Sequence, residues 1–539
     1  MASSKCPTCG TSNFTARFDL ECGTLNDLLH SQSSPLDSTG VAGTISLIDN
    51  CASEIDRLQL QVEAFSSRLR QLKEYQFKLR SLVAPVRKLP NEVLMSIFNL
   101  VSQDNALREY PFLKNSPLCP DGEHGLITMP ALVLSSVCSR WRQISLSYSA
   151  LWSRMSLMLY VDIFDSEDSD TGLSTMVKLY INRSRTSLLR LRIDARGQFS
   201  CKKPRHLALS LLGQTTQRWQ YLTFIGHNYF SRKIFSIPDN VHDFPNLQEL
   251  EFDEYDRTLL KAFGQAPNLR HLEMTCGAIE LTSNFPWPQL TSVALTGAEG
   301  LDKVMDRCPN LSSIRFQLYW RSPLSPLSHP PRAFPNIRSL SIILTGKSSD
   351  VNRLDIVLSS LICPSLTSLT FEGDSTSECA WPLRILESFL IRSSCVLANL
   401  SIRGLKLSDN DLVAVFKQLP SLTSLIVEDN CHMDSSSITS ALIRSLHSAS
   451  NPLLLPKLCH LGLTYAGKVF DDSGFVDMIQ SRCISKADAQ MTGIDPLRSL
   501  VLKSWNRTPT FLGQVADIYE PLKRLEEAGF MLIVKGVLG

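Results

Sequence analysis

The chain has 539 residues, of which 43% are hydrophobic and 20% are charged, and its net charge is +2. This composition is typical of a folded soluble protein, and the length suits either three or four ordinary domains or one elongated repeat array. The sequence has neither a Lys/Arg block that could follow phosphates or anionic lipids nor the 18 or so consecutive apolar residues of a membrane span. We therefore expect no nucleic-acid partner and no membrane association.

Residues 1–44 are rich in Ser, Thr and Gly and are predicted to form a flexible tail. The tail contains Cys6 and Cys9 in a CxxC spacing, but the further ligands within reach, such as Cys22 and His30, match no common zinc finger. We expect no metal and no cofactor. Because no signal peptide opens the sequence, we place the protein in the cytoplasm or the nucleus, where its 15 cysteines stay reduced.

Residues 45–84 show a heptad pattern that predicts a coiled-coil helix. One polar residue, Gln76, interrupts a stripe that is otherwise apolar at alternating steps of three and four: Ile48, Cys51, Ile55, Leu58, Val62, Phe65, Leu69, Leu72 and Leu79. A helix of this kind cannot bury its stripe alone. It either forms a homodimer through residues 48–82 or folds onto the helices that follow it.

Residues 85–155 predict two amphipathic helices separated by an insert at 104–130 that is rich in Pro and Gly. The first helix opens at Pro90 with Glu92 in its first turn, which favours the helix dipole. The second is expected to run without a break from Pro130 through Cys138 and Trp141. A Leu151-Trp152 pair follows it as an apolar anchor.

The motifs of these two helices resemble the F-box family. The family pattern appears as Leu89-Pro90, Glu92 and Ile97-Phe98, followed by the run from Val137 to Arg142, VCSRWR. The resemblance implies an all-α module that docks the Skp-type linker subunit of a cullin-based SCF ubiquitin ligase. The residues expected to contact the linker are Leu89, Pro90, Val93, Leu94, Ile97, Phe98, Leu134, Val137, Cys138, Trp141, Arg142 and Ile144.

After a predicted connector at 156–180, residues 181–539 repeat a unit of the form Leu-x-x-Leu-x-apolar, usually preceded by Pro-x. The intervals between units run from 21 to 39 residues, which includes the leucine-rich-repeat period. We expect an α/β solenoid with a parallel sheet on its concave face and a C-terminal cap. The units begin near residues 188, 219, 247, 269, 290, 311, 337, 366, 397, 422, 458 and 497.

The side chains that alternate with the leucines of each unit are expected to face outward on the concave side. The charged ones are the candidate target-binding residues: Glu249, Glu251, Asp253, His271, Glu273, Arg315, Arg403 and Glu428, with Lys503 further on. The acids in two successive units favour a basic partner segment. The alternative is a solvated sheet surface without a binding role.

No catalytic motif accompanies these features. The sequence lacks a dinucleotide fingerprint, an HExxH or a GxSxG element, and Asp121, Glu123 and His124 lie on a loop without further ligands. We therefore expect a non-catalytic substrate receptor of an SCF-type ligase. Its F-box would bind the linker, which is bound to the cullin scaffold, and its repeats would bind an unknown target protein. The alternative is a repeat scaffold that acts outside ubiquitin transfer.

Overall fold

The computed structural model describes residues 38–108, 128–161, 171–197, 207–226, 243–252, 257–275, 284–296, 301–319, 331–345, 352–373, 383–405, 407–429, 436–465, 470–505, 516–527 and 529–537. The chain divides into two compact units, Met1–Leu94 and Met95–Gly539, which are described separately. The predicted Cys6/Cys9 tail motif and the loop residues Asp121, Glu123 and His124 lie outside the described residues.

The first unit contains the long helix α2 (Ser38–Leu82) and the short 3-10 helix η1 (Pro85–Lys88). The predicted coiled-coil helix is therefore present, although it begins earlier than residue 45. It ends before Pro85, and Ala84 is extended with φ −58° and ψ 135°, as expected for a residue that precedes proline. Helix α3 (Asn91–Val101) spans the division between the two units.

The second unit is built on one sheet of 15 strands that follow one another in chain order, each parallel to its neighbours. A separate two-stranded sheet joins β9 and β11. The strands are β1 (Ala106–Arg108), β2 (Arg154–Val161), β3 (Leu189–Gly197), β4 (Trp219–Gly226), β5 (Glu249–Phe252), β6 (His271–Thr275), β7 (Ser292–Thr296), β8 (Ser313–Tyr319), β9 (Arg332–Ala333), β10 (Ser339–Thr345), β11 (Leu361–Ile362), β12 (Ser368–Gly373), β13 (Asn399–Arg403), β14 (Ser424–Glu428), β15 (His460–Tyr465), β16 (Ser499–Trp505) and β17 (Met531–Val537).

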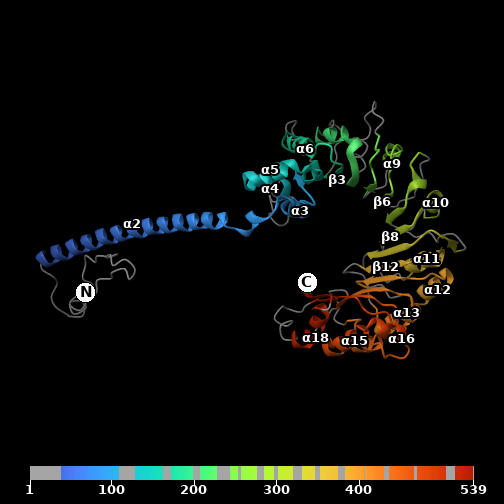
Figure 1. Ribbon diagram of the computed structural model, residues 1–539. Coiled ribbons are helices and arrows are strands. Elements are labelled where there is room, and N and C mark those ends of the chain that lie inside the picture. Colours follow the sequence, from blue (N-terminus) through green and yellow to red (C-terminus); the bar gives the residue numbers. More distant parts are fainter. Residues whose placement is uncertain are drawn as a thin grey trace. The chain divides into compact units, whose positions relative to one another are not determined.

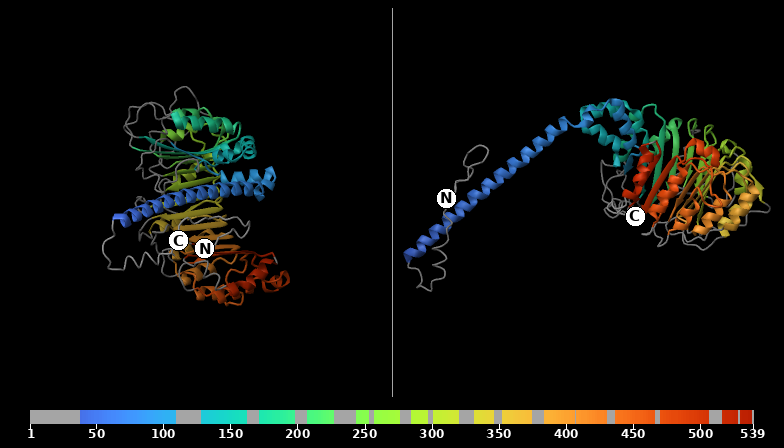
Figure 2. Two further views of the ribbon diagram at one scale, coloured as in Figure 1. Left: turned by 90° about the vertical axis from the view of Figure 1, so that its left-hand side faces the viewer. Right: turned by 60° about the horizontal axis from the view of Figure 1, so that its bottom comes forward.

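Helices cover one face of this sheet and leave the other, concave face open (Figures 1 and 2). This arrangement is an α/β solenoid, the fold class that the sequence predicts. The helical segments of the second unit are α4 (Pro130–Val137), α5 (Ser139–Ser147), η3 (Ser149–Trp152), α6 (Thr171–Ser184), α7 (Leu207–Gly213), η4 (Thr216–Arg218), α9 (Arg257–Ala262), η5 (Trp287–Gln289), α10 (Leu301–Arg307), α11 (Asn352–Ser360), α12 (Leu383–Ser393), α13 (Asp409–Lys417), α14 (Ser440–Ser445), α15 (Asp472–Arg482), α16 (Lys486–Thr492) and α18 (Ala516–Glu527).

Each of the twelve repeat units predicted from the sequence supplies one strand, from β3 to β16, and α18 with β17 forms the C-terminal end of the sheet. The N-terminal boundary is different from the prediction. Strand β1 lies within the predicted insert 104–130, and β2 and α6 occupy most of the predicted connector 156–180. Because β2 pairs with both β1 and β3, these segments belong to the sheet and do not form a connector.

Successive side chains along each strand point to opposite faces of the sheet, so one face is buried under the helices and the other is open. In β10, for example, Leu340, Ile342 and Leu344 are buried, and the residues between them are half-buried on the open face. The leucine or isoleucine at the position of Leu340 pairs with its counterpart in the neighbouring strands, Ile314 and Leu369. Stacking therefore buries a continuous apolar layer that no single unit could bury.

Asparagines that follow four of the repeat prolines add a second ladder of hydrogen bonds. Asn246 Nδ2 donates to the Gln217 carbonyl at 2.7 Å, and Asn268 Nδ2 donates to the Pro245 carbonyl at 2.6 Å. Asn310 and Asn336 repeat the contact with the prolines of the preceding units, at 2.8 and 2.9 Å. These amides join successive units where the backbone carbonyls have no strand partner.

Candidate protein-binding surfaces

The C-terminal end of α3 is fixed to the first strands by Arg154 at the start of β2. Its Nη1 donates to the carbonyls of Asn99 and Ser102 at 3.2 and 3.1 Å, and its Nη2 donates to Asn99 Oδ1 at 2.9 Å. Burial lowers the pKa of the Arg154 guanidinium, and the nearby Arg190 lowers it further. Arg154 thus caps carbonyls that the helix itself leaves without partners.

The predicted continuous helix from Pro130 is broken in the structure. Cys138 has φ −159° and ψ 171°, so α4 ends before it and α5 begins after it. Cys138 Sγ accepts a hydrogen bond from the Trp141 N–H at 3.5 Å, and Arg142 Nε donates to the Ser135 carbonyl at 3.0 Å. These two contacts satisfy backbone groups on both sides of the break, which is why an extended residue is tolerated there.

Helix α5 packs on α3 through aromatic rings. The ring centroids of Phe98 and Trp141 lie 4.8 Å apart with an interplanar angle of 58°. Phe98 and Leu94 are fully buried, and Leu134 and Ile144 are buried with only a few per cent of their surface exposed. The sequence prediction placed these four residues on a linker-binding face, whereas their side chains are buried in the structure.

A separate set of apolar side chains on α3 faces outward. Ile97, Leu100 and Val101 are spaced to share one side of the helix, and Leu100 is 71% exposed. We call these three residues the α3 stripe. Val93, one turn earlier, is also exposed, as is Val137 at the end of α4. Contiguous exposed aliphatic side chains of this kind mark sites where a partner binds.

The remaining predicted linker contacts are accessible at the surface. Pro90 and Arg142 are exposed, while Leu89, Cys138 and Trp141 are half-buried. Leu100 and Val101 were not among the predicted linker contacts. The sequence prediction assigned the apolar side chains of this helix, with Val101 but without Leu100, to one face that binds the linker. In a helix with 3.6 residues per turn, apolar side chains at 93, 94, 97, 98, 100 and 101 cover a wider arc than one core-facing stripe needs. This width is a sequence signal for a second apolar surface.

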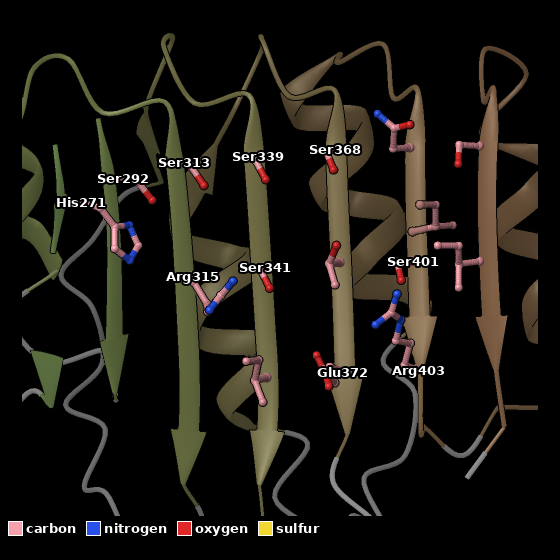
Figure 3. A pocket seen from close by; sticks show the side chains of 16 residues that line it. His271, Ser292, Ser313, Arg315, Ser339, Ser341, Ser368, Glu372, Ser401 and Arg403 are labelled. Atoms are coloured by element: carbon pink, nitrogen blue, oxygen red, sulfur yellow. The ribbon is translucent and has the colours of Figure 1, made fainter. Parts of the chain in front are cut away.

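The concave face of the sheet contains a hollow of about 550 Å³ between β6 and β14 (Figure 3). We call it the concave hollow. Four serines, Ser292, Ser313, Ser339 and Ser368, stand at the same register position on successive neighbours β7, β8, β10 and β12. We call them the serine ladder. Asn399 and Ser424 continue it on β13 and β14.

The floor of the concave hollow is mostly polar and uncharged. Ser341, Thr370 and Ser401 form a second row of hydroxyls two residues further along the strands. The Ser401 Oγ is closed off from solvent and makes no hydrogen bond to any described residue. Ser341, Thr370 and the serine ladder offer both donors and acceptors to a ligand that lies across the strands.

Charged residues border this hydroxyl surface. Glu273 Oε2 lies 3.9 Å from His271 Nε2 and 4.0 Å from Arg315 Nη1. The small Ala294 on the intervening strand β7 leaves room for Arg315 to reach across. His271 and, to a smaller extent, Arg315 lower the pKa of the Glu273 carboxyl. The acid is therefore ionised at neutral pH and partly neutralised by its neighbours.

The structure separates the predicted target-binding residues into groups. His271, Arg315 and Arg403 line the concave hollow together with Glu372, which the prediction missed. Glu249 pairs in register with His271, and Glu251 pairs with Glu273 and accepts a 2.6 Å hydrogen bond from Thr223 Oγ1. Glu428 and Lys503 lie on the same face of β14 and β16, and Asp253 lies outside the described residues.

The serine ladder had a sequence signal that the prediction did not use. The residue before the second apolar position of the unit is Ser in successive repeats, as in LTSVAL, LSSIRF, IRSLSI and LTSLTF. Parallel pairing in register then places these serines side by side. The prediction selected charged residues and passed over a repeated neutral one.

Other classes of site find no support in the described part of the chain. No group of three or more His, Cys, Asp or Glu side chains could hold a metal ion there, and no helix in that part is long and apolar enough to cross a membrane. The described cysteines are free thiols, and burial raises the pKa of both Cys308 and Cys363 to about 12. These two thiols therefore stay protonated and unreactive at neutral pH.

Comparison with known proteins gives no match, either to a protein-family model or to a curated protein. The family resemblance therefore depends on the motif residues of α3 to α5 and on the repeat period.

Proposed function

We propose that this protein is the substrate receptor of an SCF-type cullin ubiquitin ligase, with an F-box-like module at α3–α5 and leucine-rich repeats that bind the target protein. The observation that carries the proposal is the α3 stripe: a helix of F-box-like sequence keeps Ile97, Leu100 and Val101 exposed although its opposite side is buried. Exposure of this apolar surface costs free energy unless a partner covers it, and burying each such side chain contributes about 1.5–3 kcal/mol.

A receptor of this kind performs no bond chemistry. It holds a lysine-bearing target close to a charged conjugating enzyme, which replaces a rare encounter in solution by a high effective concentration. The two surfaces suit the two attachments, because the apolar α3 stripe favours a stable linker contact and the polar concave hollow favours selective recognition.

The linker contact is tested by Ile97→Asp combined with Leu100→Asp. We expect wild-type protein to co-purify with a Skp-type linker subunit and the double variant to bind it at least about 100-fold more weakly, because two carboxylates replace apolar contacts worth roughly 3 kcal/mol or more. Both side chains are exposed, so the circular dichroism spectrum and melting temperature should stay near wild type.

The matched control is Ile391→Asp combined with Val396→Asp, which makes the same change at two exposed apolar residues on and just after α12. This variant should bind the linker as the wild type does. Equal linker binding by the wild type and the α3 variant, or no binding by the wild type, would contradict the proposal. The second of these results would favour a repeat scaffold outside ubiquitin transfer.

The target contact is tested by photocrosslinking. A benzophenone amino acid at Ser341, in the concave hollow, should capture proteins that the same group at Arg384, exposed on the helical face, does not capture. Ubiquitylation of the captured proteins should fall when the Ile97→Asp, Leu100→Asp variant replaces the wild type. Identical capture from both positions would contradict a concave target site.

A further inference from the structure

Helix α2 carries an apolar stripe that no described residue of its own unit covers. Over its 45 residues, Val62, Phe65 and Leu69 are 63%, 68% and 53% exposed, and Ile48, Ile55, Leu72 and Leu79 are exposed as well. The stripe follows a strict heptad spacing for nearly five heptads. A seam of that spacing and length fits a second helix wound around it better than it fits a globular surface.

The charges on α2 are divided between its two halves. From Ser38 to Glu63 the helix has one basic residue, Arg57, and four acidic ones, which gives a net charge of −3. From Ala64 to Leu82 it has one acidic residue, Glu74, and five basic ones, which gives +4. The acidic residues of the first half are Asp49, Glu54, Asp56 and Glu63, and the basic residues of the second half are Arg68, Arg70, Lys73, Lys78 and Arg80.

We propose that α2 forms an antiparallel two-stranded coiled coil with α2 of a second copy of this chain. The antiparallel orientation lays the acidic half of each helix along the basic half of the other, whereas a parallel pair sets acid on acid and base on base. In a parallel pair the heptad would also bring Arg68 next to Lys73 of the second copy, because these residues occupy the g and following e positions.

One antiparallel register buries the whole stripe of both helices. It sets Val62 against Phe65 of the second copy at the centre, Leu58 against Leu69, and Ile48 against Leu79 towards the ends. Gln76, the one polar residue of the stripe, then meets Cys51 of the second copy, and no leucine is placed against an amide. The seam is complete, so no further partner is needed to cover it.

This orientation fixes where the rest of each chain is attached. Leu82, at the end of one helix, lies opposite residue 45 of the other. The two copies of Leu82 are therefore separated by 37 residues of helix, or about 55 Å along the axis. The second units of the two copies are therefore joined to opposite ends of the coiled coil. The dimer presents two concave faces to ligands, whether or not the protein takes part in ubiquitin transfer.

The mass of the full chain in solution tests dimerisation. Light scattering should give twice 60.2 kDa for the wild type. Val62→Asp combined with Leu69→Asp should raise the dimer dissociation constant at least about 100-fold. The two substitutions disrupt two apolar layers of the coiled coil on each side of its centre. Leu60→Asp, on the same helix but outside the stripe, should leave the dissociation constant unchanged.

A monomeric wild type would overturn the proposal, and so would a dimer that the stripe variant leaves intact. Hydrogen exchange in the strands of the sheet shows whether the stripe variant retains the fold of the second unit. Linker co-purification is a separate measurement, so a monomer that still binds the linker would refute only the dimer, and a dimer that does not bind it would refute only the proposed function.

The orientation is tested by disulfide mapping and by charge reversal. On mild oxidation, Gln76→Cys should give a link between position 76 and Cys51 of the second copy, found by peptide mass spectrometry. A parallel dimer would instead give links of 51 to 51 and 76 to 76. Arg68→Glu should weaken the antiparallel dimer, because the new carboxylate faces an acidic half, but would strengthen a parallel one by pairing with Lys73. Either parallel result would overturn the proposal.

Discussion

Replacing Arg482 by Met should destabilise the C-terminal repeats by about 3 kcal/mol or more. Arg482 is the last residue of α15 and its side chain is fully buried. Its Nε donates to the Leu446 carbonyl at 2.5 Å, and Nη1 and Nη2 donate to the Leu455 and Leu454 carbonyls at 3.0 and 2.6 Å. The substitution keeps much of the side-chain volume but removes all three hydrogen bonds. The Leu455 carbonyl keeps only the Leu458 N–H as a donor, at 3.2 Å.

The three acceptors explain the position of this arginine in the fold. Leu446 is the C-cap of α14, and Leu455 has a positive φ of 49°, which a leucine adopts only when its surroundings hold it there. Arg482 thus connects the end of α15 to the end of α14 and to the loop before β15. Burial lowers its pKa to about 10. It stays protonated at neutral pH in both the folded and the unfolded chain, so its contribution should not change between pH 6 and 8.

Hydrogen exchange gives the local measurement that a repeat array requires, because its units need not unfold together. Arg482→Met should lower protection in α14, α15 and β15 and leave β4 to β7 unchanged, together with a lower melting temperature. Arg444→Met, at an exposed arginine of α14, is the control and should change stability by no more than about 0.5 kcal/mol. Equal protection in the two variants would show that Arg482 does not hold these segments.

The solenoid was predictable from the sequence because its signal repeats. Residues such as Leu340 and Leu369 recur with the period of the unit, and self-similarity at that spacing admits few folds. The first strands were missed because they lack the pattern: β1 has three residues, and β2 is an apolar run whose alternation gives no repeat unit. Only the pairing of β1 with β2 and of β2 with β3 identifies them as strands of the sheet.

The sequence predicted the helices and apolar residues of the α3–α5 module, but not which of these side chains are buried and which are exposed. Leu94 and Ile97 are equally apolar, yet one is fully buried and the other is 38% exposed, and the sequence contains no local signal that separates them. The break at Cys138 has the same origin. Neither Val137 nor Cys138 terminates helices by itself, and the extended backbone depends on the contact of Arg142 with Ser135, seven residues earlier in the chain.

Asn105→Ala should have the largest effect on the junction between this module and the sheet, with a loss of at least about 3 kcal/mol. Asn105 is fully buried. Its Nδ2 donates to the carbonyls of Leu151 and Arg154 at 3.0 and 2.9 Å, and its Oδ1 accepts from the Ala131 N–H at 3.0 Å and from the Tyr180 hydroxyl at 3.3 Å. One amide therefore satisfies groups on α4, η3, β2 and α6, and alanine would remove these four hydrogen bonds from the interior.

Asn105→Asp separates hydrogen bonding from packing, because the two side chains have nearly the same shape. The carboxylate cannot donate to the Leu151 and Arg154 carbonyls, and burial raises the pKa of such a group, since the charged form is disfavoured. The folded state of the variant then binds its proton more tightly than the unfolded state does. Its stability deficit relative to wild type should therefore grow as the pH rises through the raised pKa and shrink as the pH falls.

Thermal melting of the full chain at pH 5 and pH 7.5, with hydrogen exchange in α4 and β2, measures both variants. Gln103→Ala, at an exposed residue two positions earlier, is the control and should melt within about 0.5 kcal/mol of the wild type at both values. If Asn105→Asp had the same stability deficit at both pH values, its cause would be packing, and the amide would not be the hydrogen-bonding centre of the junction. If the deficit is confined to higher pH, the junction between α4, β2 and α6 depends on one uncharged side chain.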